Sequence, residues 1–158
     1  VSKSNFYYHF KSKEDLGIAV LEQRRENFEG LMTATLKNPD ATPQERLQHF
    51  FTLLAEMQEG RLGQGGCPFG NLVVEVAEQS ERFRCQLIAI FEGMTSVIAD
   101  LIAEGQRLGE FRRDVSHADL AALIVQTIQG MLLMAKCHKQ VGSMERSSTL
   151  LLKLIEAA

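Results

Sequence analysis

The sequence predicts an all-α fold, and three observations support this prediction. Apolar residues recur at three- and four-residue spacing almost everywhere from Ser12 onward, as they do along the buried face of a helix. Several of these periodic segments open with Ser or Thr followed three positions later by an acidic residue, which is the capping signature of a helix start. No stretch alternates apolar and polar residues as a strand does, and no Asn-Gly or Asp-Gly hairpin turn occurs.

Capping residues, prolines and glycines divide the chain into successive helices. Proline disfavours a helical conformation in the residue before it and glycine ends helices, so Pro39, the glycine-rich stretch 60–66 and Gly109 mark boundaries. The expected helices run from Ser12 to about Leu36, from Pro43 to the glycine-rich stretch, from Pro68 to about Gln79, from Ser80 to Gly109, from Ser116 past Ala135, and onward from the Gly142-Ser143 break.

The apolar stripes of these helices predict which side chains are buried. The helix that carries Leu120 to Ala135 is apolar around much of its circumference, so we expect it to be buried on two sides, with a partner subunit as the second side. Side chains that the stripes assign to buried faces include Val20, Met57, Leu108, Leu123, Leu150 and Leu154.

Length and composition place the chain among folded globular proteins. Its 158 residues fit one ordinary domain, and 45% hydrophobic with 23% charged residues exclude disorder and fibrous repeats. Charged residues recur every few positions, so we expect no membrane-spanning helix of about 18 apolar residues. Three widely spaced cysteines, Cys67, Cys85 and Cys137, do not suggest a secreted disulfide framework. We therefore expect a cytoplasmic protein.

The head of the chain is basic and aromatic, whereas the remainder is acidic. Lys3, Lys11 and Lys13 give residues 1–13 a charge of +3, while the whole chain carries −3. Aromatic residues are interleaved with these lysines. The chain begins with Val1, not Met, in the interior of this motif, so we expect further residues to precede it in the complete protein.

The segment VSKSNFYYHFKSKEDL, residues 1–16, resembles the recognition-helix segment of transcriptional regulators of the tetracycline-repressor (TetR/AcrR) family. The resemblance implies that residues 1–11 end a helix-turn-helix and that residues 12–158 form a ligand-binding and dimerisation domain. Small polar side chains at a helix start can reach base edges in the major groove, while tyrosine, histidine and lysine can donate to phosphates. The DNA-binding candidates are Ser2, Lys3, Ser4, Asn5, Tyr7, Tyr8, His9 and Lys13.

These features predict a ligand- or redox-responsive DNA-binding repressor. By the resemblance, it binds a palindromic operator in double-stranded DNA as a homodimer through its last two helices, about residues 117–157. It responds to an unidentified small-molecule effector. The alternative is a helical small-molecule binding or scaffold protein without DNA binding, in which the basic, aromatic head only packs.

The same resemblance places an effector pocket among the middle and late helices. Methionine and phenylalanine adapt to flat or hydrophobic ligands. The alternative, common for such stripes, is that these side chains only fill the core. The candidate ligand contacts are Phe51, Leu54, Phe69, Phe91, Met94 and Met131.

Cys67 is a candidate redox sensor, with Lys136 as its partner. The glycines before Cys67 predict an accessible thiol, and Pro68 places it at a helix N-terminus, where the helix dipole favours the thiolate and lowers the pKa. By the family plan, Lys136 on the penultimate helix comes close and favours the thiolate further. The alternative is that Cys67 packs as a small apolar residue.

The sequence contains no motif for catalysis or for metal or cofactor binding. The four histidines are scattered without an HExxH spacing, and no CxxC pair exists. GxSxG, P-loop and GxGxxG motifs are absent as well. We therefore expect a protein that is not an enzyme, with no metal site and no cofactor.

Overall fold

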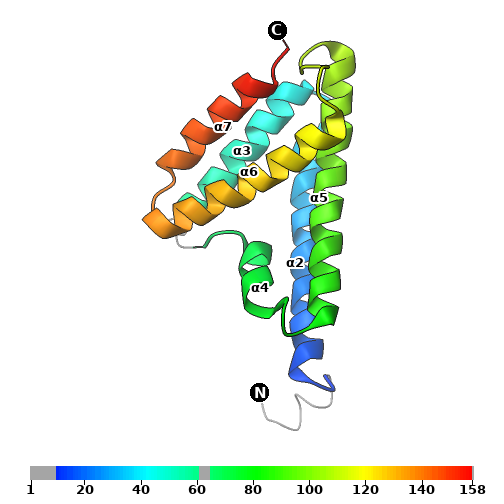
Figure 1. Ribbon diagram of the computed structural model, residues 1–158, viewed down its shortest axis with the longest axis vertical. Coiled ribbons are helices and arrows are strands. Elements are labelled where there is room, and N and C mark those ends of the chain that lie inside the picture. Colours follow the sequence, from blue (N-terminus) through cyan, green and yellow to red (C-terminus); the bar gives the residue numbers. More distant parts are fainter. Residues whose placement is uncertain (1–9, 61–64, 158) are drawn as a thin grey trace. The chain divides into compact units, whose positions relative to one another are not determined.

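The computed structural model describes residues 10–60 and 65–157, and this part of the chain is helical, as the sequence predicted (Figure 1). By its internal contacts the chain divides into two compact units, residues 1–31 and residues 32–158, with the boundary inside the first helix. The helices are α2 (Lys13–Leu36), α3 (Pro43–Glu59), α4 (Pro68–Val76), α5 (Glu81–Leu108), α6 (His117–His138) and α7 (Gly142–Ile155).

Side-chain caps start α3, α5 and α6 where the sequence predicted. At α3, the backbone N–H of Glu45 donates to Thr42 Oγ1 (3.3 Å) and the Glu45 carboxylate accepts from the Thr42 N–H (2.9 Å), which completes a capping box. Ser80 and Ser116 accept in the same way at the starts of α5 and α6. Gly109 ends α5 in the left-handed region at φ 81°, which glycine adopts without strain.

Two helix boundaries differ from the sequence prediction. Helix α4 ends at Val76, before the expected Gln79. Helix α6 runs past Ala135, as expected, and ends at His138, where Lys139 takes up the left-handed conformation (φ 54°). Gly142 lies inside α7 and does not separate it from α6; this helix starts without a side-chain cap, so the sequence carried no capping signal there.

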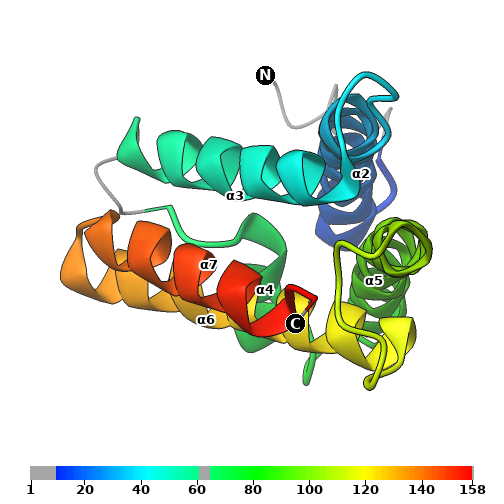
Figure 2. The same cartoon turned by 90° about the horizontal axis from the view of Figure 1, so that it is seen from above.

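In the larger unit, α6 packs along α5 and α7 returns along α6, with α3 against α7 and α5 and with α4 against α5 (Figures 1 and 2). Figure 2 shows α3, α6 and α7 side by side. The interior of this unit is made of aliphatic and phenylalanine side chains that are almost completely buried, among them Leu47, Phe50, Ile98, Ile102, Ile124 and Ala135.

Several side chains that the stripes assigned to buried faces are exposed. In α2, Val20 is exposed, whereas Ile18 and Leu21 are buried, so the buried stripe is displaced around the helix. In α3, Met57 is exposed and its neighbour Gln58 is buried, because the Gln58 amide hydrogen-bonds a loop backbone. The remaining exceptions, all exposed in the single chain, are Leu108 at the end of α5, Leu123 in α6, and Leu150 and Leu154 in α7.

Arg46 joins three helices of the larger unit through its buried guanidinium group. Its Nη1 donates to the carbonyl oxygen of Leu36 (3.2 Å), at the last residue of α2, and its Nη2 donates to Glu104 Oε1 of α5 (2.5 Å). Carbonyl groups in the last turn of a helix have no partner within that helix. Arg46 therefore caps α2 and fixes its end relative to α3 and α5.

The connection between α5 and α6 is tied to the C-terminal residues. Arg112 N–H donates to Ile155 O and Ala157 N–H donates to Glu110 O, both at 2.9 Å, so residues 110–112 pair with residues 155–157. Between these hydrogen bonds the Phe111 ring is buried against Gly105. A glycine is needed there, because any side chain on residue 105 would occupy the space of the ring.

Helices α5 and α6 are each long and apolar enough to cross a membrane, since each contains an 18-residue window with a mean hydropathy of 1.6. The expectation that no such stretch exists is therefore wrong. The two helices pack against each other, and 33% and 44% of these windows are buried inside the protein. Their apolar character is consistent with core helices of a soluble domain.

We expect Gly105→Ala to destabilise the protein by about 1–3 kcal/mol, because a Cβ there would lie 2.3 Å from the Phe111 ring. Gly93→Ala, in the same helix, is the matched control: its Cβ meets nothing within 4 Å, and alanine should stabilise the helix by about 0.5–1 kcal/mol. Urea unfolding midpoints measure both changes. Equal effects of the two substitutions would contradict the packing described here.

Candidate functional site

A short loop before α4 is held in place by side chains from three helices. The buried amide of Gln58 forms two hydrogen bonds with Gly66: its Oε1 accepts from the Gly66 N–H (2.9 Å) and its Nε2 donates to the Gly66 carbonyl (3.3 Å). Asn71 Nδ2 donates to Gly65 O, and Lys136 Nζ donates to Asn71 Oδ1, each at 2.9 Å. Side chains of α3, α4 and α6 therefore hold Gly65 and Gly66, which directly precede Cys67.

Gly66 is required by both conformation and space. Its φ of +62° lies in the left-handed region, and an added Cβ would come within 3.1 Å of Lys136 Cδ. Lys136 thus reaches the loop beside Cys67, as the family resemblance implied, but it is not among the groups that shift the pKa of Cys67. Its ammonium group donates its hydrogen bond to Asn71.

Cys67 caps the N-terminus of α4, where its Sγ accepts a hydrogen bond from the Gly70 N–H at 3.3 Å. The thiol is buried, so the expectation that the preceding glycines leave it accessible is wrong. Burial raises the pKa of Cys67 above its ordinary value, because desolvation outweighs the backbone N–H groups of Gly70 and Phe69 and the nearby amide of Gln129, which favour the thiolate. The predicted lowering of the pKa is therefore also wrong, and the group is a thiol at neutral pH.

An apolar cavity of about 400 Å³ lies beside this cysteine. Its walls come from α4, α5 and α6, and two of its lining residues, Gly70 and Gln129, also contact Cys67. None of the described residues that line it is ionisable. They are Gly70, Val73, Phe91, Thr95, Ala122, Val125, Gln126 and Gln129.

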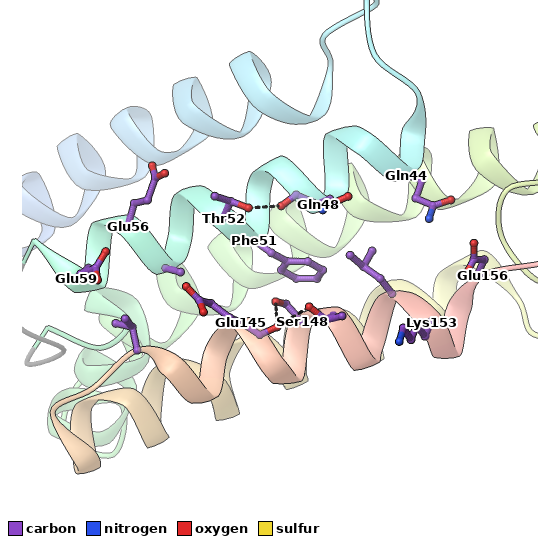
Figure 3. A pocket seen from close by; sticks show the side chains of 14 residues that line it. Gln44, Gln48, Phe51, Thr52, Glu56, Glu59, Glu145, Ser148, Lys153 and Glu156 are labelled. Carbon is purple, nitrogen blue, oxygen red and sulfur yellow. Dashed lines mark hydrogen bonds between the residues drawn. The ribbon is translucent and has the colours of Figure 1, made fainter.

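A second cavity, of about 530 Å³, is a groove between α3 and α7 (Figure 3). The Phe51 ring lies at its centre in Figure 3, and the glutamates Glu56, Glu59, Glu145 and Glu156 are spread along its length. Lys153 is the one basic side chain among its described lining residues. The groove is therefore polar and acidic, in contrast to the cavity beside Cys67.

The structure does not gather the predicted effector contacts into one pocket. Phe91 lines the cavity beside Cys67, and Phe51 lines the α3–α7 groove. The other four side chains are buried in the core and line neither cavity: Leu54, Phe69, Met94 and Met131. A role in ligand binding stays a prediction for all six.

Gln129 is the residue of this region that sequence reasoning missed. It lies in the most apolar part of α6, between Ile128 and Met131 in sequence, and its Nε2 is buried with no hydrogen-bond partner among the described residues. A polar side chain on an otherwise apolar helix was the available signal. The sequence could not reveal that this amide would face a cysteine 62 positions earlier in the chain.

The candidate DNA contacts Ser2, Lys3, Ser4, Asn5, Tyr7, Tyr8 and His9 lie outside the described residues. Lys13 is described: it is the first residue of α2 and is exposed. Ser12 precedes it and caps the helix, with its Oγ accepting from the Asp15 N–H at 3.0 Å. Lys13 is therefore placed at the junction between the basic head and the helical body.

The last two helices expose large apolar side chains. Among these, Leu133 is 64% exposed, Leu154 59% and Leu150 58%. Leu123 and Met134 of α6 are exposed as well. This surface of α6 and α7 is suited to contact with another protein surface.

Within the described ranges, no three His, Cys, Asp or Glu side chains are grouped so that they could hold a metal ion. The cavities offer a neutral apolar site and an acidic groove. The described residues therefore offer two cavities of different chemistry and a set of exposed apolar side chains on α6 and α7.

Residues 43–151 match the family model described as "Tetracyclin repressor-like, C-terminal domain". The chain belongs to the tetracycline-repressor (TetR) family of transcriptional regulators, as the motif at its start indicated. Regulators of this family bind DNA operators as dimers and respond to small-molecule effectors, and they are generally not enzymes.

Named relatives extend this finding over nearly the whole chain. The chain is 31% identical over 155 residues to the HTH-type transcriptional repressor DhaR of Mycobacterium sp. (strain GP1), covering 98% of this chain and 76% of DhaR. It is 33% identical over 137 residues to the transcriptional regulator AcuR of Cereibacter sphaeroides, covering 86% of this chain and 62% of AcuR.

A solved structure shows the same fold. The regulatory protein TetR from Rhodobacter sphaeroides superposes with a TM-score of 0.92 at 26% sequence identity, over 98% of this chain and 82% of that protein. The predicted family and fold class are therefore confirmed. No relationship found here favours the alternative of a scaffold protein without DNA binding.

Proposed function

We propose that this chain regulates transcription as a cytoplasmic homodimer that binds a palindromic operator and releases it when an effector binds. The observation that carries the proposal is the family match over residues 43–151 on a domain that contains an apolar cavity. Residues 1–11 supply the DNA contacts together with Lys13, and residues 12–158 bind the effector and the second subunit. The chain acts through binding, without catalysis or a cofactor.

The cavity beside Cys67 is the effector site in this proposal. Its walls belong to α4, α5 and α6, so a ligand there biases the relative positions of these helices. Arg46 ties α5 to the C-terminal end of α2 through Glu104 and Leu36. Because α2 continues directly from the DNA-binding segment, a shift at its C-terminal end alters the presentation of that segment, which couples the two sites.

Selection of random duplex DNA by the full-length protein should recover a palindrome with half-sites about one helical turn apart, because two symmetric subunits present two recognition helices. Lys13→Ala should weaken binding evenly across sequences. It should also lower by about one the slope of the logarithm of the binding constant against the logarithm of salt concentration, as loss of one phosphate contact does. Lys153→Ala, in the α3–α7 groove, is the control and should change neither. Recovery of no sequence at low salt would favour the scaffold alternative.

The second subunit in this proposal binds the exposed apolar surface of α6 and α7. Leu123, Leu150 and Leu154 are exposed in the single chain although the apolar stripes assigned them to buried faces, and Met134 of α6 is exposed as well. Burying such side chains contributes about 1.5–3 kcal/mol each when burial is complete. The helices therefore carry enough apolar surface for a stable pair.

Leu154→Glu should shift the protein from dimer to monomer, because it places an unpaired charge in the apolar centre of the proposed interface. Leu108→Glu is the matched control: Leu108 is 64% exposed, against 59% for Leu154, but lies at the end of α5 and outside the interface. Sedimentation equilibrium measures both. Retention of the dimer by the Leu154 variant would place the interface elsewhere.

An oxidant response through Cys67 is the second arm of the proposed regulation. A thiolate that attacks a peroxide becomes a sulfenic acid and releases hydroxide, and polar oxygen at this position would disturb the start of α4. The N–H groups of Gly70 and Phe69 and the Gln129 amide favour the thiolate once it forms. Burial keeps the thiolate fraction small near neutral pH, so the response is slow there.

Hydrogen peroxide should release the wild-type protein from its operator and leave Cys67→Ser bound. Since burial raises the pKa of Cys67, the thiolate fraction and the rate of release should increase steeply between about pH 7 and about pH 9. Cys137→Ser, which alters an exposed cysteine of α6, is the control and should respond as the wild type does. Fluorescence anisotropy of the operator DNA measures the release. If peroxide also releases the Cys67→Ser variant, Cys67 is not the sensor.

A further inference from the structure

We infer that the cavity between α4, α5 and α6 binds a neutral, largely apolar small molecule with one hydrogen-bond acceptor, and that the side-chain amide of Gln129 donates to this acceptor. The inference deepens the proposed function, since it names the chemical class of the effector for that site. It rests on the lining of the cavity and on the unsatisfied hydrogen-bonding capacity of Gln129.

The lining of the cavity offers no charged partner to a ligand. No ionisable side chain occurs among its described lining residues, and a charge moved from water into such a site without a partner loses its solvation uncompensated. The volume of about 400 Å³ lies in the range of small-molecule sites. Val73, Phe91 and Val125 supply apolar contacts for the body of the ligand.

Gln129 spans the short distance between the cavity and Cys67. Its Oε1 lies beside Gly70, so closely that a Cβ on residue 70 would be 2.9 Å away. Gly70 and Gln129 both line the cavity. The Nε2 of Gln129 is buried and has no hydrogen-bond partner among the described residues, which leaves a donor unsatisfied at a substantial energetic cost.

A half-turn of the amide about its Cγ–Cδ bond offers the thiol an acceptor and turns the NH₂ group toward the cavity wall. Burial keeps Cys67 protonated, so the group that faces Gln129 is an S–H donor that requires an acceptor. After the half-turn, Oε1 faces the thiol and the NH₂ group takes the place beside Gly70, at the cavity wall. The NH₂ group then requires an acceptor, and a carbonyl-type oxygen of a ligand in the cavity provides it.

The other polar side chains of the cavity do not fill this role. Thr95 Oγ1 already donates to the Phe91 carbonyl at 2.8 Å, which leaves its hydroxyl as an acceptor only. Gln126 is exposed, so water satisfies its amide with or without a ligand. Gln129 is therefore the side chain that selects for an acceptor on the ligand.

Two probes of nearly equal size test this selection: acetophenone, which carries a carbonyl group, and ethylbenzene, which does not. Their dissociation constants for the full-length wild-type protein, free of DNA, are measured by ligand-observed NMR titration. Acetophenone should bind at least about fivefold more tightly, since a hydrogen bond to a buried donor contributes about 1 kcal/mol or more. Equal affinities, or no binding of either probe at millimolar concentration, would overturn the inference.

Gln129→Met removes the donor while keeping the length and shape of the side chain. The variant should bind both probes equally, and its retained affinity for ethylbenzene shows that the cavity is intact. Gln126→Met is the matched control, and it should keep the preference of the wild type for acetophenone. A preference that survives in Gln129→Met would assign the donor to another group and overturn the role of Gln129.

This experiment is independent of the proposed function. The probes are titrated without DNA, so a protein that recovers no operator can still show the acceptor preference and support the inference. Conversely, a protein that binds a palindromic operator but shows equal probe affinities keeps its regulatory function and loses this ligand assignment.

Discussion

The apolar surface of α6 is wider than its neighbours in the chain can cover, and much of the structure follows from this constraint. One side of the helix packs on α5 and another on α7, which buries Leu120, Ile124, Ile128 and Leu132. A third part, at Ala122 and Val125, forms a wall of the apolar cavity. The remainder, including Leu123 and Met134, is exposed in the single chain and suited to a second subunit. One helix thus contributes to the core, to the proposed ligand site and to the proposed subunit interface.

Polar side chains inside this unit are placed where backbone groups need partners. Gln58 satisfies both the N–H and the carbonyl of Gly66, and Arg46 caps the end of α2 while pairing with Glu104. Burial makes these groups specific for their partners, because a polar group left unpaired in the interior lowers the stability of the fold. Two buried nitrogens of this unit lack a partner among the described residues, Arg46 Nε and Gln129 Nε2. Of the two, Gln129 also lines the apolar cavity, and the proposed ligand contact rests on that combination.

The two cavities differ in the chemistry that they offer. The cavity beside Cys67 is uncharged, whereas the α3–α7 groove contains four glutamates and one lysine among its described lining residues. The pKa of the adjacent Cys67 is raised by the burial of its thiol. The two cavities therefore suit ligands of different chemistry.

The sequence by itself determined the fold class, the family and most helix boundaries, because caps such as Thr42 with Glu45 and stops such as Gly109 act within about four residues of the chain. The sequence did not predict the exposure of Val20 and Met57, since an apolar stripe gives the period of a helix but not which of its side chains another element covers. The pKa of Cys67 and the role of Gln129 were decided only by tertiary structure. Each depends on groups of α4 and α6 brought together from distant parts of the chain, where desolvation outweighs the local helix dipole.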